Sequence, residues 1–125
     1  MPDIFIEHVN ITVRDAERSA MLMEQLFDWK VRWQGPALND GHSVHVGDDR
    51  FYLALYSPPE TPDADSFVKG RPLNHIGICV DDLDSIEQRV IDAGLIPFNH
   101  AEYAPGRRFY FLDPDGTEFE IVSYS

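Results

Sequence analysis

The chain has 125 residues, of which 43% are hydrophobic and 26% are charged, and this composition describes one ordinary globular domain. It excludes a disordered tail, a collagen and a membrane span. The 10 Lys and Arg against 22 Asp and Glu give a formal net charge of -12, which repels phosphate backbones and anionic lipids. We therefore expect neither nucleic acid nor a membrane as a partner.

The cysteine content and the first residues indicate in which cellular compartment the protein is expected. Cys79 is the only cysteine, so no disulfide can form within the chain. The opening residues, MPDIFIEHVNITV, lack the basic stretch, the unbroken apolar core and the cleavage site of a secretory signal. Together these features predict a cytoplasmic protein.

Two segments of the chain repeat each other when His8 is laid on His75: HVNITVRD and HIGICVDD. In each, a histidine precedes alternating apolar residues, and an acidic residue follows where a helical pattern begins. The repeat predicts a strand followed by a helix, twice.

Each predicted helix has an apolar stripe and a capping residue. The stripe of the first helix consists of Leu22, Met23, Leu26, Phe27 and Trp29, and that of the second of Leu83, Ile86, Val90 and Ala93. Asp15 and Asp82 are placed to cap the two N-termini, because an Asp side chain accepts from the free N–H groups there. Gly94 stands where a left-handed C-terminal cap is expected.

Three strand-like segments follow each helix. They are KVRWQ, SVHVG and RFYLALYS in the first half, and LIPFN, RRFYFLD and TEFEIVS in the second. We expect a tight turn at Gly47-Asp48-Asp49 and a three-residue hairpin loop at Pro114-Asp115-Gly116. The chain thus predicts a single α+β domain (1–125) of two tandem β-α-β-β-β modules, about 4–57 and 73–123. A linker rich in Pro and Asp, about 58–72, joins them.

The repeat marks four equivalent positions: His8 and His75 on the first strands, and Ala54 and Glu120 on the last strands. Three of these residues carry metal-ligand chemistry, and Ala54 does not. Burial of two histidines and a glutamate is costly, and binding of one metal ion would explain all three. The alternative to metal binding, for each histidine taken alone, is that it is an ordinary hydrogen-bonded core or surface residue.

The paired modules and the segments NHIGICVDDLD and FYFLDPDGTEFEIV resemble the vicinal oxygen chelate superfamily, from Phe5 to about Ser123. This superfamily includes glyoxalase I, extradiol dioxygenases, methylmalonyl-CoA epimerase, and fosfomycin and bleomycin resistance proteins. The resemblance implies that the modules curl into a half-barrel cavity and that the chain forms a homodimer. It also implies a divalent metal on His8, His75 and Glu120, with Ala54 at the position of an absent fourth ligand.

Two imidazoles and one carboxylate can hold Fe, Mn, Zn or Ni and leave positions open for a small substrate with adjacent oxygens. The favoured interpretation is therefore a metal-dependent glyoxalase-like or dioxygenase-like enzyme, and an extradiol ring-cleaving dioxygenase and an isomerase or lyase are both open within it. One alternative is a metal-free protein similar to bleomycin resistance proteins, with an acidic cleft for a cationic ligand. Another is a thiol transferase similar to fosfomycin resistance proteins.

Tyr110 and His42 are the candidate proton-handling residues. With Pro114-Asp115-Gly116 as the loop, Tyr110 pairs with Glu120 and faces the same cavity. With Gly47-Asp48-Asp49 as the loop, His42 lies opposite Ala54, where it could be a base or a substitute ligand, and His45 faces the other way.

The remaining candidates are basic residues and one further histidine. Arg107 and Arg108 are adjacent on a predicted strand, so one of them points into the cavity, where it could bind a substrate anion. Lys69 and Arg71, in the linker, could close over such a ligand. His100 is expected to be exposed.

Overall fold

The computed structural model describes residues 4–60, 70, 72–103 and 105–125. The chain forms two compact units, Met1–Asp63 and Ala64–Ser125, and each is described by itself. The division falls within the expected linker. Lys69 and Arg71, the linker residues proposed to close over a ligand, lie outside the described residues.

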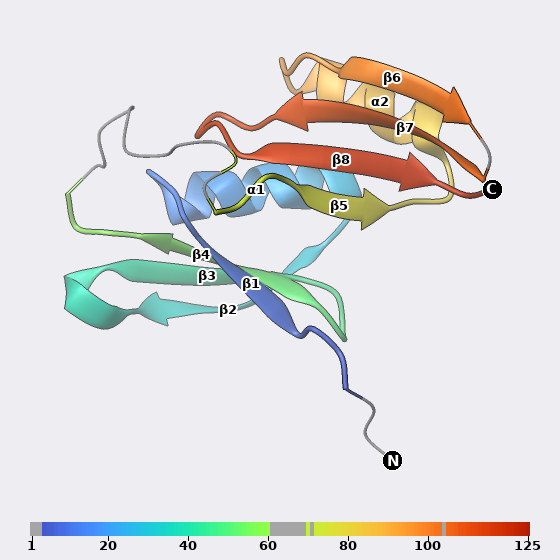
Figure 1. Cartoon of the computed structure of the whole chain (residues 1–125). Helices are drawn as coiled ribbons and strands as arrows, with labels where there is room; N and C mark the ends of the chain where they lie inside the picture. Colours follow the sequence, from blue (N-terminus) through green and yellow to red (C-terminus); the bar gives the residue numbers. More distant parts are fainter. Residues whose placement is uncertain (1–3, 61–69, 71, 104) are drawn as a thin grey trace. The chain divides into compact units, whose positions relative to one another are not determined.

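Unit 1 has the element order β-α-β-β-β, with a short 3-10 turn η1 (Leu38–Asp40). Its elements are β1 (His8–Thr12), α1 (Ala16–Phe27), β2 (Lys30–Pro36), β3 (His42–Gly47) and β4 (Tyr52–Ser57). The strands form one sheet in the order β1-β4-β3-β2, in which β1 is parallel to β4 and the other neighbours are antiparallel (Figure 1).

Unit 2 repeats this arrangement. Its elements are β5 (Ile76–Cys79), α2 (Leu83–Asp92), β6 (Phe98–Tyr103), β7 (Gly106–Leu112) and β8 (Glu118–Ser123), with the sheet order β5-β8-β7-β6. In both units the helix packs against one face of its own sheet (Figure 1). The expected α+β fold of two β-α-β-β-β modules is confirmed.

The helix ends follow local chemistry. The side chains of Asp15 and Asp82 accept hydrogen bonds from the backbone N–H groups of Arg18 and Ser85, at 3.1 and 3.0 Å, as capping requires. Gly94 has a φ of 85°, the left-handed conformation predicted for it.

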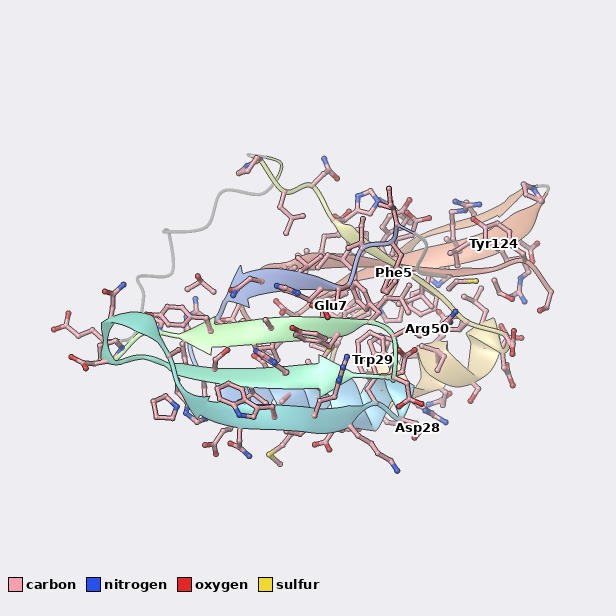
Figure 2. The ribbon with its side chains drawn as sticks, turned by 90° about the horizontal axis from the view of Figure 1, so that it is seen from below. Phe5, Glu7, Asp28, Trp29, Arg50 and Tyr124 are labelled. Atoms are coloured by element: carbon pink, nitrogen blue, oxygen red, sulfur yellow. The ribbon has the colours of Figure 1, made fainter. Side chains whose placement is uncertain are left out.

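Two expectations about element bounds are wrong. The first helix ends at Phe27, because Asp28 adopts a left-handed φ of 58°, so Trp29 lies beyond the helix (Figure 2). The buried face of that helix consists of Ala16, Ala20, Met23 and Leu26. The segment LIPFN is not a strand over its full length, since β6 begins only at Phe98.

The core of each unit lies between its sheet and its helix. In unit 1 the buried sheet residues include Val44, Val46, Leu53 and Leu55, and in unit 2 they include Phe109, Phe111, Phe119 and Ile121. Successive strand residues point to opposite faces, so the residues between these core positions lie on the other face of each sheet. We call this the helix-distal face of each unit.

Candidate functional site

The strongest candidate site of unit 2 is a contact between His75 and Glu120 on the helix-distal face. His75 immediately precedes β5, and Glu120 lies on β8 opposite Gly77 of β5. Nε2 of His75 lies 3.0 Å from Oε1 of Glu120. The side chain of Glu120 is only 13% exposed, so its carboxylate needs a cationic partner.

The spacing of this pair is that of a hydrogen bond, and it is also compatible with two ligands of one metal ion. Two ligand atoms bound to one ion at about 2.1 Å and at right angles to each other lie about 3.0 Å apart. The distance between the imidazole nitrogen and the carboxylate oxygen has this value. Both donor types also suit first-row divalent ions.

The other oxygen of Glu120 is held by Arg108. Nη1 of Arg108 donates to Oε2 of Glu120 at 2.9 Å, and the arginine side chain is only 14% exposed. Arg107 points the opposite way and pairs with Asp84 of α2 and with Glu102, each at 2.9 Å. The expected split of the arginine pair is confirmed, and only Arg108 shares a face with Glu120.

Tyr110 lies directly opposite Glu120 on β7, as predicted. Its ring meets the His75 ring edge to face, with centroids 5.7 Å apart and an interplanar angle of 82°. Phe98 of β6 lies on the other side of this tyrosine, with ring centroids 6.1 Å apart. The phenol is therefore part of the same cluster as the His75 and Glu120 pair.

Unit 1 carries a row of rings that crosses its sheet on the helix-distal face. The row consists of His8 on β1, Tyr52 on β4, His45 on β3 and Trp33 on β2. Successive ring centroids are 4.9, 4.6 and 5.0 Å apart. Burial, and then the positive charges of His8 and Arg32, lower the pKa of His45.

The prediction that His42 lies opposite Ala54 is wrong, because His45 holds that place and His42 lies opposite Ser57. His42 therefore points to the helix side, where Nε2 lies 3.5 Å from Glu17 of α1 and 3.3 Å from Gln34.

The cause of this difference is the turn between β3 and β4. It has four residues (48–51) rather than three, since Gly47 pairs with Tyr52. The side chain of Asp48 holds this turn by accepting hydrogen bonds from the backbone N–H groups of Arg50 and Phe51, at 2.8 and 2.9 Å. Sequence reasoning thus missed His45, and the hydrogen-bonding capacity of Asp48 was the signal for it.

The two units place their special residues equivalently. Relative to Ala54 and Glu120 on the last strands, His45 and Tyr110 are the corresponding cross-strand partners. His45 therefore joins Tyr110 as a candidate for proton handling.

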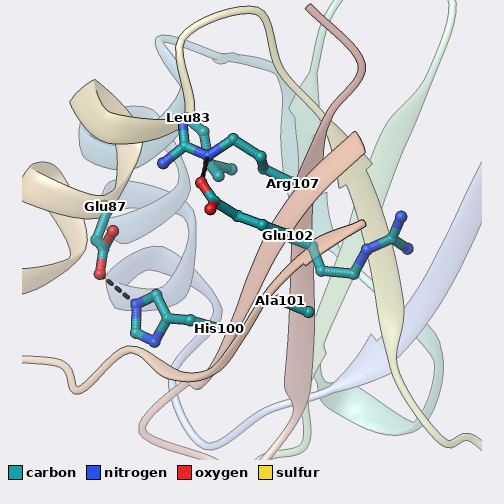
Figure 3. A pocket seen from close by; sticks show the side chains of 7 residues that line it. Leu83, Glu87, His100, Ala101, Glu102 and Arg107 are labelled. Atoms are coloured by element: carbon teal, nitrogen blue, oxygen red, sulfur yellow. Dashed lines mark hydrogen bonds and ion pairs between the residues drawn. The ribbon is translucent and has the colours of Figure 1, made fainter. Parts of the chain in front are cut away.

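A hollow of about 370 Å³ lies in unit 2 between α2 and the strands β6 and β7 (Figure 3). His100 is exposed, as expected, and its Nε2 pairs with Glu87 of α2 at 2.5 Å. Arg107 and Glu102 pair with each other at the same hollow. These mutual pairs satisfy the charges around the hollow, so we assign it no catalytic role.

The three expected metal ligands are divided between the units, with His8 in unit 1 and His75 and Glu120 in unit 2. Among the described residues, no group of three or more His, Cys, Asp or Glu side chains is gathered within either unit in a way that could hold an ion. The set of three ligands stays a prediction. No helix in the described part of the chain is both long and apolar enough to cross a membrane.

Comparison with known proteins agrees with this architecture. A curated relative, the glutathione transferase FosA of Serratia marcescens, is 25% identical over 123 residues, which are 93% of this chain and 78% of the relative. A glyoxylase/bleomycin resistance protein/dioxygenase domain from Frankia sp. EAN1pec is also 25% identical. Its structure has a TM-score of 0.84 and the match covers 99% of this chain and 100% of that chain.

A third protein shares the fold alone. The fosfomycin resistance protein FosX of Listeria monocytogenes, solved with Mn(II) and a sulfate ion, is 14% identical with a TM-score of 0.72, over 100% of this chain and 95% of that chain. The family model described as the Glyoxalase/Bleomycin resistance protein/Dioxygenase superfamily matches residues 5–121. The chain belongs to this superfamily.

Proposed function

We propose that this protein is a divalent-metal-dependent enzyme in which His8, His75 and Glu120 hold the ion. The substrate is a small molecule that binds the ion through two adjacent oxygens. The single observation that carries the proposal is the 3.0 Å approach of Nε2 of His75 to Oε1 of Glu120 on a partly buried face. The repeat adds His8, which occupies the position of His75 in unit 1.

The donor set decides what the ion contributes. Two imidazole nitrogens and one carboxylate oxygen suit Fe, Mn, Zn or Ni, and three ligands leave positions open for a chelating substrate. When bound, such an ion supplies a Lewis acid that stabilises negative charge developing on substrate oxygens.

The protein's own residues then have separate tasks. Arg108 keeps the carboxylate of Glu120 fixed through its second oxygen. Tyr110, whose hydroxyl is both a donor and an acceptor, is placed to exchange a proton with a substrate oxygen beside His75. His45, with its lowered pKa, is neutral at pH 7 and is suited to accept a proton.

A second candidate function is thiol transfer of the fosfomycin-resistance kind. It is favoured by the 25% identity to the glutathione transferase FosA over 93% of this chain. A phosphonate substrate requires several basic groups, however, and Arg107 is turned away into pairs with Asp84 and Glu102. We therefore place a substrate with adjacent oxygens, such as a catechol or a dicarbonyl compound, ahead of a phosphonate.

A metal-free binding protein with an acidic cleft is the remaining alternative, and the net charge of -12 is compatible with it. Such a protein has no need for His75 beside Glu120. Metal content distinguishes the two interpretations.

The test is elemental analysis of the purified, tag-free protein after loading with each of the four ions and dialysis. We expect close to one ion per chain, which is lost in both His75→Ala and Glu120→Gln. The matched control, His42→Gln, removes a histidine on the helix side and should retain the ion. No bound ion in the parent protein under any loading condition would overturn the proposal. An assay of glutathione transfer to fosfomycin with the loaded protein decides for or against the second candidate.

A further inference from the structure

The two predicted histidine ligands share a feature that goes beyond their place in the repeat. In each case the side chain of the preceding residue bonds to Nδ1 of the imidazole. Oδ1 of Asn74 lies 2.8 Å from Nδ1 of His75, and Oε1 of Glu7 lies 2.9 Å from Nδ1 of His8. The same arrangement thus occurs independently in the two units.

This contact determines which nitrogen can bind an ion. A carboxylate or amide oxygen only accepts a hydrogen bond, so the imidazole nitrogen facing it must carry a proton. At His75 the carboxylate of Glu118 lies 3.9 Å from the same nitrogen and favours the same proton position. The other nitrogen, Nε2, faces Oε1 of Glu120 at 3.0 Å, and an ion bound there would take the place of the proton that this contact otherwise requires.

Glu7 is itself held in place. It lies immediately before β1 (Figure 2), and its backbone oxygen accepts from the backbone N–H of Tyr52 at 3.0 Å, continuing the pairing of β1 with β4. The hydroxyl of Tyr52 donates to Oε1 of Glu7 at 3.3 Å, while the Tyr52 ring stacks on the His8 ring. The orientation of His8 is therefore fixed from two sides.

We propose that Asn74 and Glu7 are positioning residues, which hold the Nδ1 protons of His75 and His8 and present both Nε2 atoms to the ion. This inference rests on the proposed function, because it assigns the ligating atoms of the same metal site. Partners of this kind fix the ring orientation and tautomer of metal-binding histidines, and their loss typically weakens metal affinity about 10-fold to 100-fold. The partners differ chemically, since Glu7 supplies a carboxylate oxygen and Asn74 an amide oxygen.

The first readout is spectroscopic and needs no substrate. Long-range ¹H–¹⁵N NMR spectra of the protein loaded with diamagnetic Zn(II) distinguish a protonated imidazole nitrogen from a metal-bound one. We expect His8 and His75 each to show a protonated Nδ1 and a metal-bound Nε2. Ligation through Nδ1 at either histidine would overturn the assignment for that histidine.

The second readout is the dissociation constant of Zn(II), measured by competition with a chelator. Asn74→Leu and Glu7→Leu each remove the accepting oxygen and should each weaken binding about 10-fold to 100-fold. Asn74→Asp keeps an accepting oxygen and should bind at least as tightly as the parent protein. Glu60→Leu, at another exposed glutamate, makes the same change of side chain and charge as Glu7→Leu and should have no effect.

The outcomes separate this inference from the proposed function. If the parent protein binds the ion, and His75→Ala loses it, but Asn74→Leu and Glu7→Leu bind as tightly as the parent, the positioning role is overturned and the metal site stands. If the parent protein binds no ion, both are overturned.

Discussion

Arg108 and Glu120 form a largely buried ion pair across β7 and β8, with 2.9 Å between Nη1 and Oε2. Their side chains are only 14% and 13% exposed. The same carboxylate contacts His75 through its other oxygen. Glu120 is therefore held between an arginine and an imidazole.

Removal of Arg108 should destabilise the protein strongly, because it leaves the Glu120 carboxylate buried with one partner fewer. We expect Arg108→Met to lower the free energy of unfolding by about 3 kcal/mol in urea denaturation. The neighbouring Arg107→Met removes an arginine that is 46% exposed and pairs with exposed carboxylates, so it should cost no more than about 1 kcal/mol. The double variant Arg108→Met/Glu120→Gln should cost less than the sum of its single changes. Additive losses would contradict the coupling.

His45 should titrate below the ordinary histidine pKa of about 6.5. Burial has the largest effect on this pKa, and the positive charges of His8 and Arg32 lower it further. In a ¹H–¹³C NMR titration, Arg32→Gln should therefore raise the pKa of His45, while Arg50→Gln should leave it unchanged. Since the folded pKa lies below the unfolded one, this histidine costs stability as the pH falls below the unfolded pKa. A measured value above 6.5 would disprove the environment described for it.

Asp113, in the hairpin between β7 and β8, should make the stability of the protein depend on pH. Burial raises the pKa of this carboxyl to about 6, although its Oδ1 accepts hydrogen bonds from the backbone N–H groups of Asp115 and Thr117. Above that pKa the folded state holds a buried charge, so stability attributable to this group is lost as the pH rises from about 4 to about 7.

The variant Asp113→Asn keeps the accepting oxygen and removes the charge. It should be more stable than the parent at pH 7, by roughly 3 kcal/mol for a pKa raised from 3.8 to about 6, and the gain should vanish near pH 4. The measurement is the difference in free energy of unfolding between the two proteins across this range. A difference independent of pH would exclude the raised pKa.

Gly47 should tolerate no larger residue, because a Cβ there would lie 2.1 Å from the backbone oxygen of Phe51 and 2.5 Å from Cα of Tyr52. Gly47→Ala is expected to cost about 2 kcal/mol of stability, measured by thermal or urea unfolding. Gly77 is the matched control, since it also lies in a strand but a Cβ added there would meet no atom within 4 Å. Equal losses in the two variants would show that the close approach at Gly47 is not the cause.

Much of the fold follows from local chemistry that a sequence displays directly. Asp15 and Asp82 cap the helices because their side chains reach N–H groups three residues away. Gly116 takes a φ of 89° in the hairpin loop because glycine, which has no Cβ, adopts this conformation without strain. This loop puts Tyr110 opposite Glu120. At these positions the deciding contact spans a few residues, and the prediction was correct.

The register of β3 against β4 could not be predicted correctly from the sequence. The placement of His42 or His45 opposite Ala54 depends on whether the turn spans residues 47–49 or residues 48–51. The side chain of Asp48 supports the longer turn. An error of this kind reverses the face of every residue on the strand, so the candidate base changed from His42 to His45.

For the proposed metal ligands, too, only part of the arrangement could be predicted from the sequence. The repeat identified His75 and Glu120, and their contact in unit 2 is consistent with the prediction that they act together. The role of Arg108 required the structure, because alternation along a strand does not say which of two adjacent arginines faces the carboxylate.

The proposal that one ion binds His8, His75 and Glu120 together is tested most directly by a count of the imidazoles bound to that ion. We would record pulsed EPR spectra of the protein loaded with one equivalent of Mn(II), using ¹⁵N-labelled histidine to identify the coupled nitrogens. We expect two bound imidazoles in the parent protein and one in each of His8→Ala and His75→Ala. No bound imidazole in the parent, or an unchanged count in His8→Ala, would contradict it.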